Sequence, residues 1–272
     1  LIQFKKKYFL SYLIIHYSKY PFEKIFILAG YKGEQILKKF YKKNSNGIEI
    51  ECFVEKKSLG TGGALSQLKN KTSNDLIVMN GDSFINCELE EFFFKKNKYS
   101  SIFLTKNKNY LSNNILANLK INKKSIVCFN GQLMNAGIYF IKKKIVKKIT
   151  KNYISLENDI ISKLIKKRLI KGKLVQSKFI DIGTYKNLNS VKNNFHNQFK
   201  KPAAFLDRDG VINHDYGYVS NIKNFDLKFN VIKSLKYLNK KNYNIFIVTN
   251  QSGIARGMYT EKDYLQFYKK IK

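Results

Sequence analysis

Two aspartates follow a short apolar segment in the last third of the chain. Ala203–Leu206 is predicted to be a buried strand, and Asp207 and Asp209 come directly after it. Side chains two apart on an extended backbone share a side, and the carboxyl ends of parallel strands face the crevice in which α/β proteins bind ligands. One carboxylate could attack phosphorus while the other protonates the leaving oxygen and later activates water. Because two anions repel a phosphate, the pattern also predicts a divalent cation, and Mg²⁺ suits hard oxygen ligands.

A second polar loop follows the next predicted strand, Asn244–Val248. It reads Thr249-Asn250-Gln251-Ser252-Gly253, and a hydroxyl and amides followed by glycine can cradle a phosphate. Two of the three arginines, Arg208 and Arg256, lie in these two loops, so we expect their planar guanidinium groups to grip phosphate. An Asx turn or a calcium-like loop would also explain the first motif alone. The two loops together favour phosphatase chemistry.

The earlier part of the chain has its own candidate residues. A glycine-rich turn precedes a predicted helix and consists of Gly60, Thr61, Gly62 and Gly63. Its backbone N–H groups are predicted to approach a nucleotide closely. Asp82 follows the predicted strand Leu76–Met79, and Asp181 lies near the end of this region. Each piece alone is compatible with a structural turn, but two carboxylates that meet on one cation would suit nucleotidyl transfer.

Alternating strands and helices must position these residues. The predicted parallel strands are Lys24–Ala29, Ile48–Val54, Leu76–Met79, Ser101–Leu104, Ala136–Ile141, Ala203–Leu206 and Ile245–Val248. The predicted helices are Gly33–Tyr41, Leu89–Lys96, Leu156–Lys167 and Val231–Lys240. This alternation predicts an α/β fold, with a Rossmann-like, mostly parallel sheet covered by helices. A polar stretch that ends at Pro202 predicts two domains, residues 1–195 and 200–272.

The second domain resembles the haloacid-dehalogenase-like phosphatase superfamily. Asp207–Asn213, Asp215–Val219 and Thr249–Gly257 narrow the resemblance to D-glycero-D-manno-heptose 1,7-bisphosphate 7-phosphatases and their histidinol-phosphatase relatives. The resemblance covers the first half of such a Rossmannoid domain. The superfamily's later lysine, its further acidic metal ligand and the zinc loop common in this family have no counterpart before Lys272.

This resemblance implies a role for each matching residue. Asp207 would be the nucleophile and Asp209 the general acid and base, and both would bind Mg²⁺, Asp209 through its backbone carbonyl. Thr249 would steady the transferring phosphoryl group. The implied substrate-binding residues are Asp215, Tyr216, Gly217, Tyr218, Asn250, Gln251, Ser252 and Arg256.

The first domain resembles the sugar-phosphate nucleotidyltransferases, and most closely the heptose-1-phosphate guanylyltransferases, from about Phe9 to Val191. The matching blocks are Gly30–Ile36, Leu59–Ala64, Asn80–Ser83, Asn135–Tyr139 and Asp181–Thr184. The resemblance implies that Asp82 and Asp181 bind Mg²⁺ and that Gly60, Thr61, Gly62, Gly63 and Asp82 bind the nucleotide. It also implies that Asn135, Gly137 and Glu157 contact the sugar.

Two of this family's features have no counterpart in the sequence. The amino-terminal G-x-G-T-R-L loop of the family would precede Leu1, and Ile126–Gln132 stands where the family has a Glu-Lys pair. Together with the features that have no counterpart before Lys272, this leads us to expect a fragment at both ends.

The composition adds limits on partners. The formal net charge is +32, but lysine supplies nearly all of it, whereas nucleic-acid surfaces use arginine for bidentate contacts. We therefore expect compositional drift and no nucleic-acid partner, although the charge would attract phosphorylated substrates. No apolar run is long enough to span a membrane, and the three cysteines form no C-x-x-C pair, so we expect no membrane partner and a cytoplasmic location. No pattern indicates an oligomeric state.

The two resemblances predict one bifunctional enzyme, because a 7-phosphatase makes the heptose 1-phosphate that the transferase would couple to a nucleotide. The substrates would be a sugar phosphate and a nucleoside triphosphate of undetermined base, with Mg²⁺ as cofactor. The alternatives are a histidinol-phosphate or other sugar-phosphate phosphatase joined to a hexose-1-phosphate transferase, or an inactive or nucleic-acid-binding module.

Overall fold

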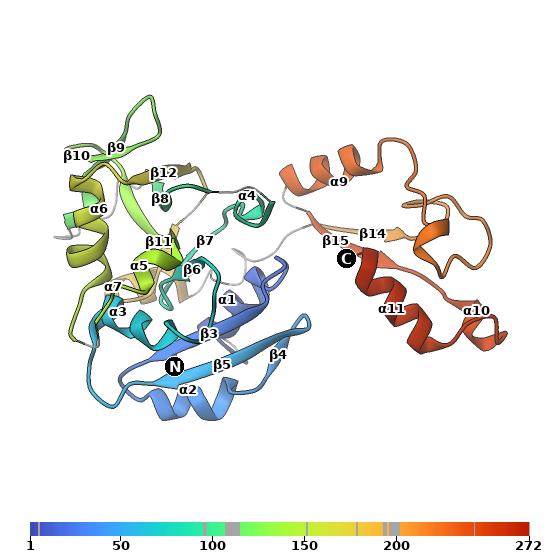
Figure 1. Cartoon of the computed structure of the whole chain (residues 1–272), viewed down its shortest axis with the longest axis horizontal. Helices are drawn as coiled ribbons and strands as arrows, with labels where there is room; N and C mark the ends of the chain where they lie inside the picture. Colours follow the sequence, from blue (N-terminus) through green and yellow to red (C-terminus); the bar gives the residue numbers. More distant parts are fainter. Residues whose placement is uncertain are drawn as a thin grey trace. The chain divides into compact units, whose positions relative to one another are not determined.

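The computed structural model describes residues 1–4, 6–94, 97–106, 115–150, 152–177, 179–192, 195, 202–241 and 243–271. The chain divides into two compact units, Leu1–Phe195 and His196–Lys272 (Figure 1). Each unit is described by itself.

Unit 1 alternates strands with short helices. Its strands are β1 (Gln3–Phe4), β2 (Lys7–Tyr8), β3 (Lys24–Ala29), β4 (Asn44–Ser45), β5 (Ile48–Val54), β6 (Leu76–Met79), β7 (Ser83–Ile85), β8 (Ser100–Thr105), β9 (Leu119–Ile121), β10 (Val127–Phe129), β11 (Met134–Ile141), β12 (Ile170–Val175) and β13 (Phe179–Asp181). Its helices are α1 (Phe9–Tyr17), α2 (Gly33–Phe40), α3 (Gly60–Gly63), η1 (Ala64–Leu68), α4 (Glu90–Phe94), η2 (Ile115–Ala117), α5 (Lys143–Val146), η3 (Leu156–Ile161), α6 (Ser162–Lys166) and α7 (Tyr185–Lys192).

A four-stranded sheet with the order β12-β8-β11-β6 forms the centre of unit 1. β12 and β8 are parallel, but β11 runs antiparallel to both β8 and β6, so the prediction of a parallel strand at Ala136–Ile141 is wrong. β11 is buried along nearly its whole length, and a strand buried on both faces has a largely apolar sequence, which is also typical of parallel strands. Such a sequence reports burial on both faces and says nothing about strand direction.

A second sheet has the order β3-β5-β4, in which β3 and β5 are parallel as predicted. Helices α1 and α2 pack on one of its faces through Ile14 and Phe40, which form a small core with Ile50 and Cys52. The larger core lies around β8, β11 and β12, where Ile102, Leu104 and Tyr139 are fully buried, among other side chains. The predicted α/β fold class is therefore confirmed, with a central sheet that is mixed.

Two predicted helices differ from the observed ones. The segment predicted as one helix over Leu156–Lys167 begins as the π-helix η3 and continues as α6. Helix α4 covers only part of the predicted Leu89–Lys96, whose last two residues lie outside the described residues. η3 places Glu157 at the start of its first turn, which matters for the site.

Unit 2 contains a pair of parallel strands, β14 (Ala203–Asp207) and β15 (Asn244–Val248). Its helices are η4 (Ile222–Asn224), α9 (Val231–Lys240), α10 (Ser252–Ala255) and α11 (Glu261–Ile271). Figure 1 shows α9 and α11 on opposite sides of the strand pair. The pair carries a stacked Phe205 and Phe246, whose ring centroids are 5.1 Å apart.

Two sequence expectations concern the chain as a whole. Among the described residues, no helix is long and apolar enough to cross a membrane. All three cysteines are free thiols, with Cys52 and Cys87 buried and Cys128 half-buried.

Candidate active sites

Asp82 and Asp181 meet at one point in unit 1. Asp82 lies just beyond β6, and Asp181 ends β13, which pairs with β7 so that Asp181 lies opposite Ser83. A Cβ placed on Gly183 would lie 3.0 Å from Asp82 Oδ2 and 3.1 Å from Asp181 Oδ1. The absence of a side chain at Gly183 therefore leaves room for a ligand between the two carboxylates.

The electrostatics of this pair suit a cation. Although Asp82 is open to the solvent, the surrounding protein desolvates its carboxylate and raises its pKa, and the charges of Asp181 and Glu157 add to the rise. The Ser83 hydroxyl, which donates to Asp82 Oδ1 at 3.0 Å, opposes it. No lysine or arginine among the described residues forms an ion pair with either aspartate. Two converging carboxylates fit Mg²⁺, which takes one or two carboxylates and fills its other positions with water and substrate oxygens. The described residues contain no group of three or more acidic, His or Cys ligands.

The glycine-rich turn packs against its own chain. Gly62 N and Gly63 N donate to Ile154 O at 2.8 and 3.0 Å, so these two N–H groups are already used. A Cβ on Gly63 would lie 2.3 Å from Asn152 O. Close approach of backbone to backbone thus accounts for the glycines, and nucleotide binding by Gly60, Thr61, Gly62 and Gly63 stays a prediction. In this turn Thr61 is exposed and lines the cavity of unit 1.

A hydrogen-bonded network joins the predicted sugar-binding residues. Asn135 Nδ2 donates to the hydroxyl of Tyr139, and this hydroxyl donates to Glu157 Oε1 at 3.0 Å. Glu157 Oε2 accepts from Thr61 Oγ1 at 2.9 Å, which links the sugar residues to the glycine-rich turn. Asn135 Oδ1 accepts from Gly137 N at 2.9 Å, where β11 bulges and Gly137 has a φ of +70°. The fold thus brings Asn135, Gly137, Glu157 and Thr61 together.

Tyr139 is the residue of this site that the sequence interpretation did not assign. Its side chain is fully buried, and burial together with the charge of Glu157 raises its pKa well above the ordinary value. The hydroxyl therefore stays protonated and can keep donating to Glu157. Tyr139 is the last residue of the matching block Asn135–Tyr139, and this position is the feature of the sequence that could have identified it.

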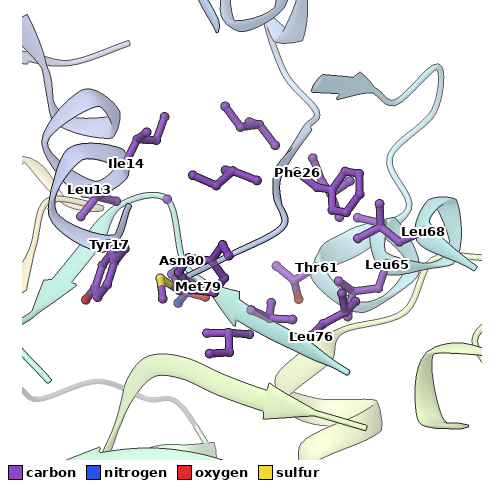
Figure 2. Close-up of a pocket in the computed structure, with 18 of the residues that line it drawn as sticks. Leu13, Ile14, Tyr17, Phe26, Thr61, Leu65, Leu68, Leu76, Met79 and Asn80 are labelled. Atoms are coloured by element: carbon purple, nitrogen blue, oxygen red, sulfur yellow. The ribbon is translucent and has the colours of Figure 1, made fainter. Parts of the chain in front are cut away.

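A large cavity of about 1670 Å³ opens beside the carboxylate pair. Its polar end is lined by Thr61, Asn80, Asp82 and Gly183, among others. The remainder is largely apolar, and Figure 2 shows side chains of α1 on one side of it and side chains of η1 on the other. The walls between them belong to β3 and β6.

In unit 2, strand pairing brings the two predicted catalytic loops together. Asp207 pairs in register with Val248, so Thr249 follows directly beside it. Gln251 Nε2 donates to Thr249 Oγ1 at 2.8 Å and reaches Asp209 Oδ2 at 3.4 Å. The nucleophile candidate, the acid/base candidate and the phosphate-steadying hydroxyl therefore share one end of the sheet.

Arg208 is engaged in the interior of unit 2. It is only 2% exposed, its Nε and Nη2 donate to the two oxygens of Asp209 at 3.0 and 2.6 Å, and Nη2 also donates to Val219 O at 2.6 Å. Its guanidinium faces the rings of Tyr264 and Phe267 at 5.7 and 5.3 Å. These contacts engage Nε and Nη2 inside the protein, whereas the buried Nη1 has no hydrogen-bond partner among the described residues, so contact of Arg208 with phosphate stays a prediction.

Arg208 also sets the charge state of Asp209. Burial alone raises the pKa of Asp209, but hydrogen bonds from Arg208 and Asn213 and the charge of Arg208 outweigh burial and hold the pKa below its ordinary value. Asn213 is fully buried, donates to Asp209 Oδ1 at 3.0 Å and was not singled out from the sequence. Its place four residues after Asp209 in the motif was the only signal.

The predicted substrate residues of unit 2 form an exposed rim. Arg256 lies over the ring of Tyr218 at 5.7 Å, so the loop after the first motif meets the loop after the second. Asp215 Oδ1 accepts from Gly217 N at 2.9 Å and Tyr216 donates to Asp226 at 3.2 Å, contacts that shape this loop. The other members of the rim are Asn250 and Ser252, both exposed, and the half-buried Gln251. Arg256, unlike Arg208, is free to meet an anion.

Comparison with known proteins agrees with the geometry of unit 1. Residues 1–112 match the sequence model of the Nucleotidyl transferase family. The solved structure of HddC from Yersinia pseudotuberculosis complexed with GMP-PN is similar, with a TM-score of 0.58 and 22% identity, over 71% of this chain and 88% of that one. The inositol-1-phosphate CTP transferase of T. maritima is similar with a TM-score of 0.56 and 16% identity, over 73% of this chain and 86% of that one. At these identities the similarity shows the fold.

A different set of relatives matches a shorter part of the chain. The D-glycero-beta-D-manno-heptose-1,7-bisphosphate 7-phosphatase of Haemophilus influenzae is 55% identical over 64 residues, or 24% of this chain and 35% of that protein. That of Escherichia coli K12 is 52% identical over 63 residues, or 23% of this chain and 33% of that protein. The chain spans about a third of the length of these curated relatives. It therefore joins a region similar to nucleotidyl transferases to a region similar to heptose bisphosphate 7-phosphatases.

Proposed function

We propose that this protein makes nucleotide-activated heptose by two reactions, dephosphorylation of a heptose 1,7-bisphosphate at position 7 and nucleotidyl transfer to the heptose 1-phosphate. The observation that carries the proposal is the presence of both similarities in one chain, since the product of the first reaction is the substrate of the second. Nucleoside triphosphates are cytoplasmic substrates, so we place the reaction sequence in the cytoplasm.

In the first reaction, an oxygen of Asp207 attacks the phosphorus of the 7-phosphate, and the bond from phosphorus to the sugar oxygen breaks. Because its lowered pKa leaves Asp209 ionised in the free protein, Asp209 passes to that oxygen a proton that the phosphate monoanion of the substrate brings. Asp209 then takes a proton from the water that releases inorganic phosphate from Asp207. Thr249 donates its hydroxyl to a phosphoryl oxygen, and Gln251 holds Thr249 and Asp209 in one group. Arg256 and Tyr218 bound the entrance and orient the anionic substrate.

In the second reaction, the phosphate of the sugar attacks the α-phosphorus of the nucleoside triphosphate and pyrophosphate leaves. Asn135 and Glu157, fixed by Tyr139, orient the sugar. Asp82 and Asp181 would hold Mg²⁺ here, and Asp207 and Asp209 would hold it in unit 2. When bound, the ion neutralises the negative charge of the phosphate oxygens.

Release of inorganic phosphate from heptose 1,7-bisphosphate in the presence of Mg²⁺ tests the first reaction. Asp207→Asn should reduce the rate by at least about a thousandfold, because it removes the attacking carboxylate. Asp263→Asn is the matched control, since Asp263 is an exposed aspartate of the same unit that hydrogen-bonds to Thr260 at the start of α11. It should lower stability but leave the rate of phosphate release by the folded protein unchanged. Full activity of Asp207→Asn would exclude Asp207 as the nucleophile.

Formation of pyrophosphate from heptose 1-phosphate and each of the four nucleoside triphosphates tests the second reaction and identifies the base. Asp82→Asn should abolish turnover, and Asp75→Asn, at the far end of β6, should not. A chain that releases phosphate but forms no pyrophosphate with any triphosphate would limit the function to the phosphatase.

A further inference from the structure

The side-chain amide of Gln251 lies between the two predicted catalytic loops of unit 2. Its Nε2 donates to Thr249 Oγ1 at 2.8 Å and, over longer distances, to Asn250 O at 3.3 Å and Asp209 Oδ2 at 3.4 Å. A backbone carbonyl oxygen can only accept a hydrogen bond, and Asp209 Oδ2 already accepts from Arg208 Nη2 at 2.6 Å. These acceptors require the nitrogen of the amide on this side, so its oxygen, Oε1, lies on the other.

Tyr259 contacts that oxygen. Its hydroxyl donates to Gln251 Oε1 at 2.8 Å. Desolvation by the surrounding protein raises the pKa of Tyr259, so the phenol keeps its proton at neutral pH and stays a donor. An amide turned over would place Oε1 against Asn250 O and Asp209 Oδ2, where oxygen would face oxygen. The hydroxyl of Tyr259 therefore favours the one orientation in which every contact of the amide joins a donor to an acceptor.

A turn after α10 brings Tyr259 back against the start of that helix. Met258 N donates to Gly253 O at 2.9 Å. Gly257 N donates to Ile254 O at 3.0 Å, and Gly257 has a φ of +69°. These two hydrogen bonds and the left-handed glycine form a Schellman motif, which ends the helix and reverses the chain. A Cβ on Gly253 would lie 2.5 Å from Cε1 of Tyr259, so the ring lies directly on the Gly253 backbone.

The direction of these hydrogen bonds decides what the Thr249 hydroxyl can do. Because Thr249 Oγ1 accepts from Gln251 Nε2, its own proton is not used in that bond and can be donated to a phosphoryl oxygen. If Oε1 lay in the place of Nε2, the hydroxyl would donate to Oε1 and would lose this proton for the phosphoryl group. Oε1 would also lie beside the carboxylate of Asp209.

We propose that Tyr259 is a positioning residue of the phosphatase reaction, because it orients the Gln251 amide and thereby directs the hydroxyl proton of Thr249 to the transferring phosphoryl group. Tyr259 acts through Gln251 and not on the substrate. The inference rests on the phosphatase half of the proposed function. It adds to the site a residue that lies beyond both motif loops and is placed there by the turn at Gly257.

Tyr259→Phe removes the hydroxyl and keeps the ring on Gly253. With the full chain, heptose 1,7-bisphosphate and Mg²⁺, the kcat for phosphate release should fall by about tenfold. This is less than the loss of roughly a hundredfold expected when Thr249→Val removes the donor itself. The KM should change by less than about twofold, because no contact with the substrate is lost. Tyr268→Phe, at an exposed tyrosine of α11, is the control and should leave both constants unchanged.

A double-mutant cycle separates orientation of the amide from general stability. In a Gln251→Ala background there is no amide to orient, so Tyr259→Phe should lower the kcat by less than about twofold further. A tenfold loss that persists in this background would show that Tyr259 acts through the fold, and would overturn the proposal. An unchanged kcat of Tyr259→Phe in the parent background would overturn it as well.

The side-chain amide of Gln251 also gives a reading that needs no turnover. In NMR spectra of nitrogen-labelled protein, its N–H signals are those that disappear in Gln251→Ala. Their exchange with water should be at least about tenfold slower than that of Gln266, an exposed glutamine of α11, and Tyr259→Phe should remove most of this protection. Equal exchange in the parent and in Tyr259→Phe would contradict the orienting role. If the parent releases no phosphate from heptose bisphosphate, the proposed function fails, whereas the amide signals still decide whether Tyr259 orients Gln251.

Discussion

At the scale of single residues, buried polar side chains hold a predicted site carboxylate in each unit. Tyr139 fixes Glu157 in unit 1, and Arg208 with Asn213 fixes Asp209 in unit 2. Their burial makes their hydrogen bonds costly to lose, because an unpaired buried polar atom must give up water without replacement.

Tyr139→Phe removes one hydroxyl and leaves the ring in place. Glu157 Oε1 and Asn135 Nδ2 then lose their shared partner, so the free energy of unfolding should fall by about 1–3 kcal/mol. The KM for the sugar 1-phosphate should rise by roughly tenfold, which is about 1.4 kcal/mol, with a smaller change in kcat. Urea unfolding and steady-state kinetics measure the two effects.

Tyr20→Phe is the matched control for this substitution. Tyr20 is also buried, and its hydroxyl donates to Cys87 O at 2.9 Å, outside the site. It should lower stability without changing the KM. An equal change of KM in both variants would show that Tyr139 acts only through general stability.

At the scale of elements, the sequence predicts where strands and helices begin and end better than it predicts which segments they pair with. The apolar runs of β3, β5 and β6 and the helical spacing of α9 have the predicted limits, because each pattern is local. The direction of β11 and the π-helix η3 depend on contacts with distant segments. In the same way, the position of the two motifs after their strands predicts that Asp207 lies beside Val248. The burial of Arg208 against the rings of α11 was not predicted, because it depends on a helix far along the chain.

The glycine-rich turn gives a test of why its glycines are there. Gly63→Ala would place a Cβ 2.3 Å from Asn152 O, so the backbone must shift, and we expect a loss of about 1–3 kcal/mol in the free energy of unfolding. Gly81→Ala meets nothing within 4 Å and should change stability by no more than about 0.5 kcal/mol. Thermal unfolding of the two variants checks this, and equal stability of both would contradict the packing explanation.

The start of α11 gives a pH-dependent test. Thr260 and Asp263 form a reciprocal capping box, in which Asp263 accepts from Thr260 N and Oγ1 at 3.0 and 2.6 Å and Thr260 Oγ1 accepts from Asp263 N at 3.2 Å. These hydrogen bonds lower the pKa of Asp263. A carboxylate with a lowered pKa stabilises the fold above its unfolded pKa of about 3.9 and loses this effect as the pH falls through the folded pKa.

Asp263→Asn should therefore destabilise the protein at pH 7, and the difference from the parent should shrink once the pH falls below about 4. Urea unfolding between pH 7 and pH 3 measures it. In a Thr260→Ala background the same substitution should show a much weaker dependence on pH. The Thr260 hydroxyl that donates to Asp263 is then absent, and only the donation from the backbone N remains. A difference that persists unchanged at low pH would contradict the role of the charge.

At the scale of the whole molecule, the net charge of +32 needs an explanation that does not rely on nucleic acid. Phosphate recognition on a duplex uses arginine forks as well as lysine, and one of the three arginines, Arg208, is buried and engaged within unit 2. Lysines spread over the surface instead create a general positive potential. Such a potential attracts any anion, including the sugar phosphates and nucleotides that the proposed reactions consume.

This interpretation predicts how salt and DNA affect the protein. Retention of DNA on a filter should fall steeply between 50 and 200 mM salt, as for contacts made only through charge. Duplex DNA at physiological salt should leave phosphate release from heptose bisphosphate unchanged, while the KM of this doubly phosphorylated substrate should rise with ionic strength because screening weakens its attraction. Salt-resistant, sequence-dependent binding that also inhibits phosphate release would instead make nucleic acid a specific partner. The positive charge would then belong to a binding surface, and compositional drift would no longer explain the excess of lysine over arginine.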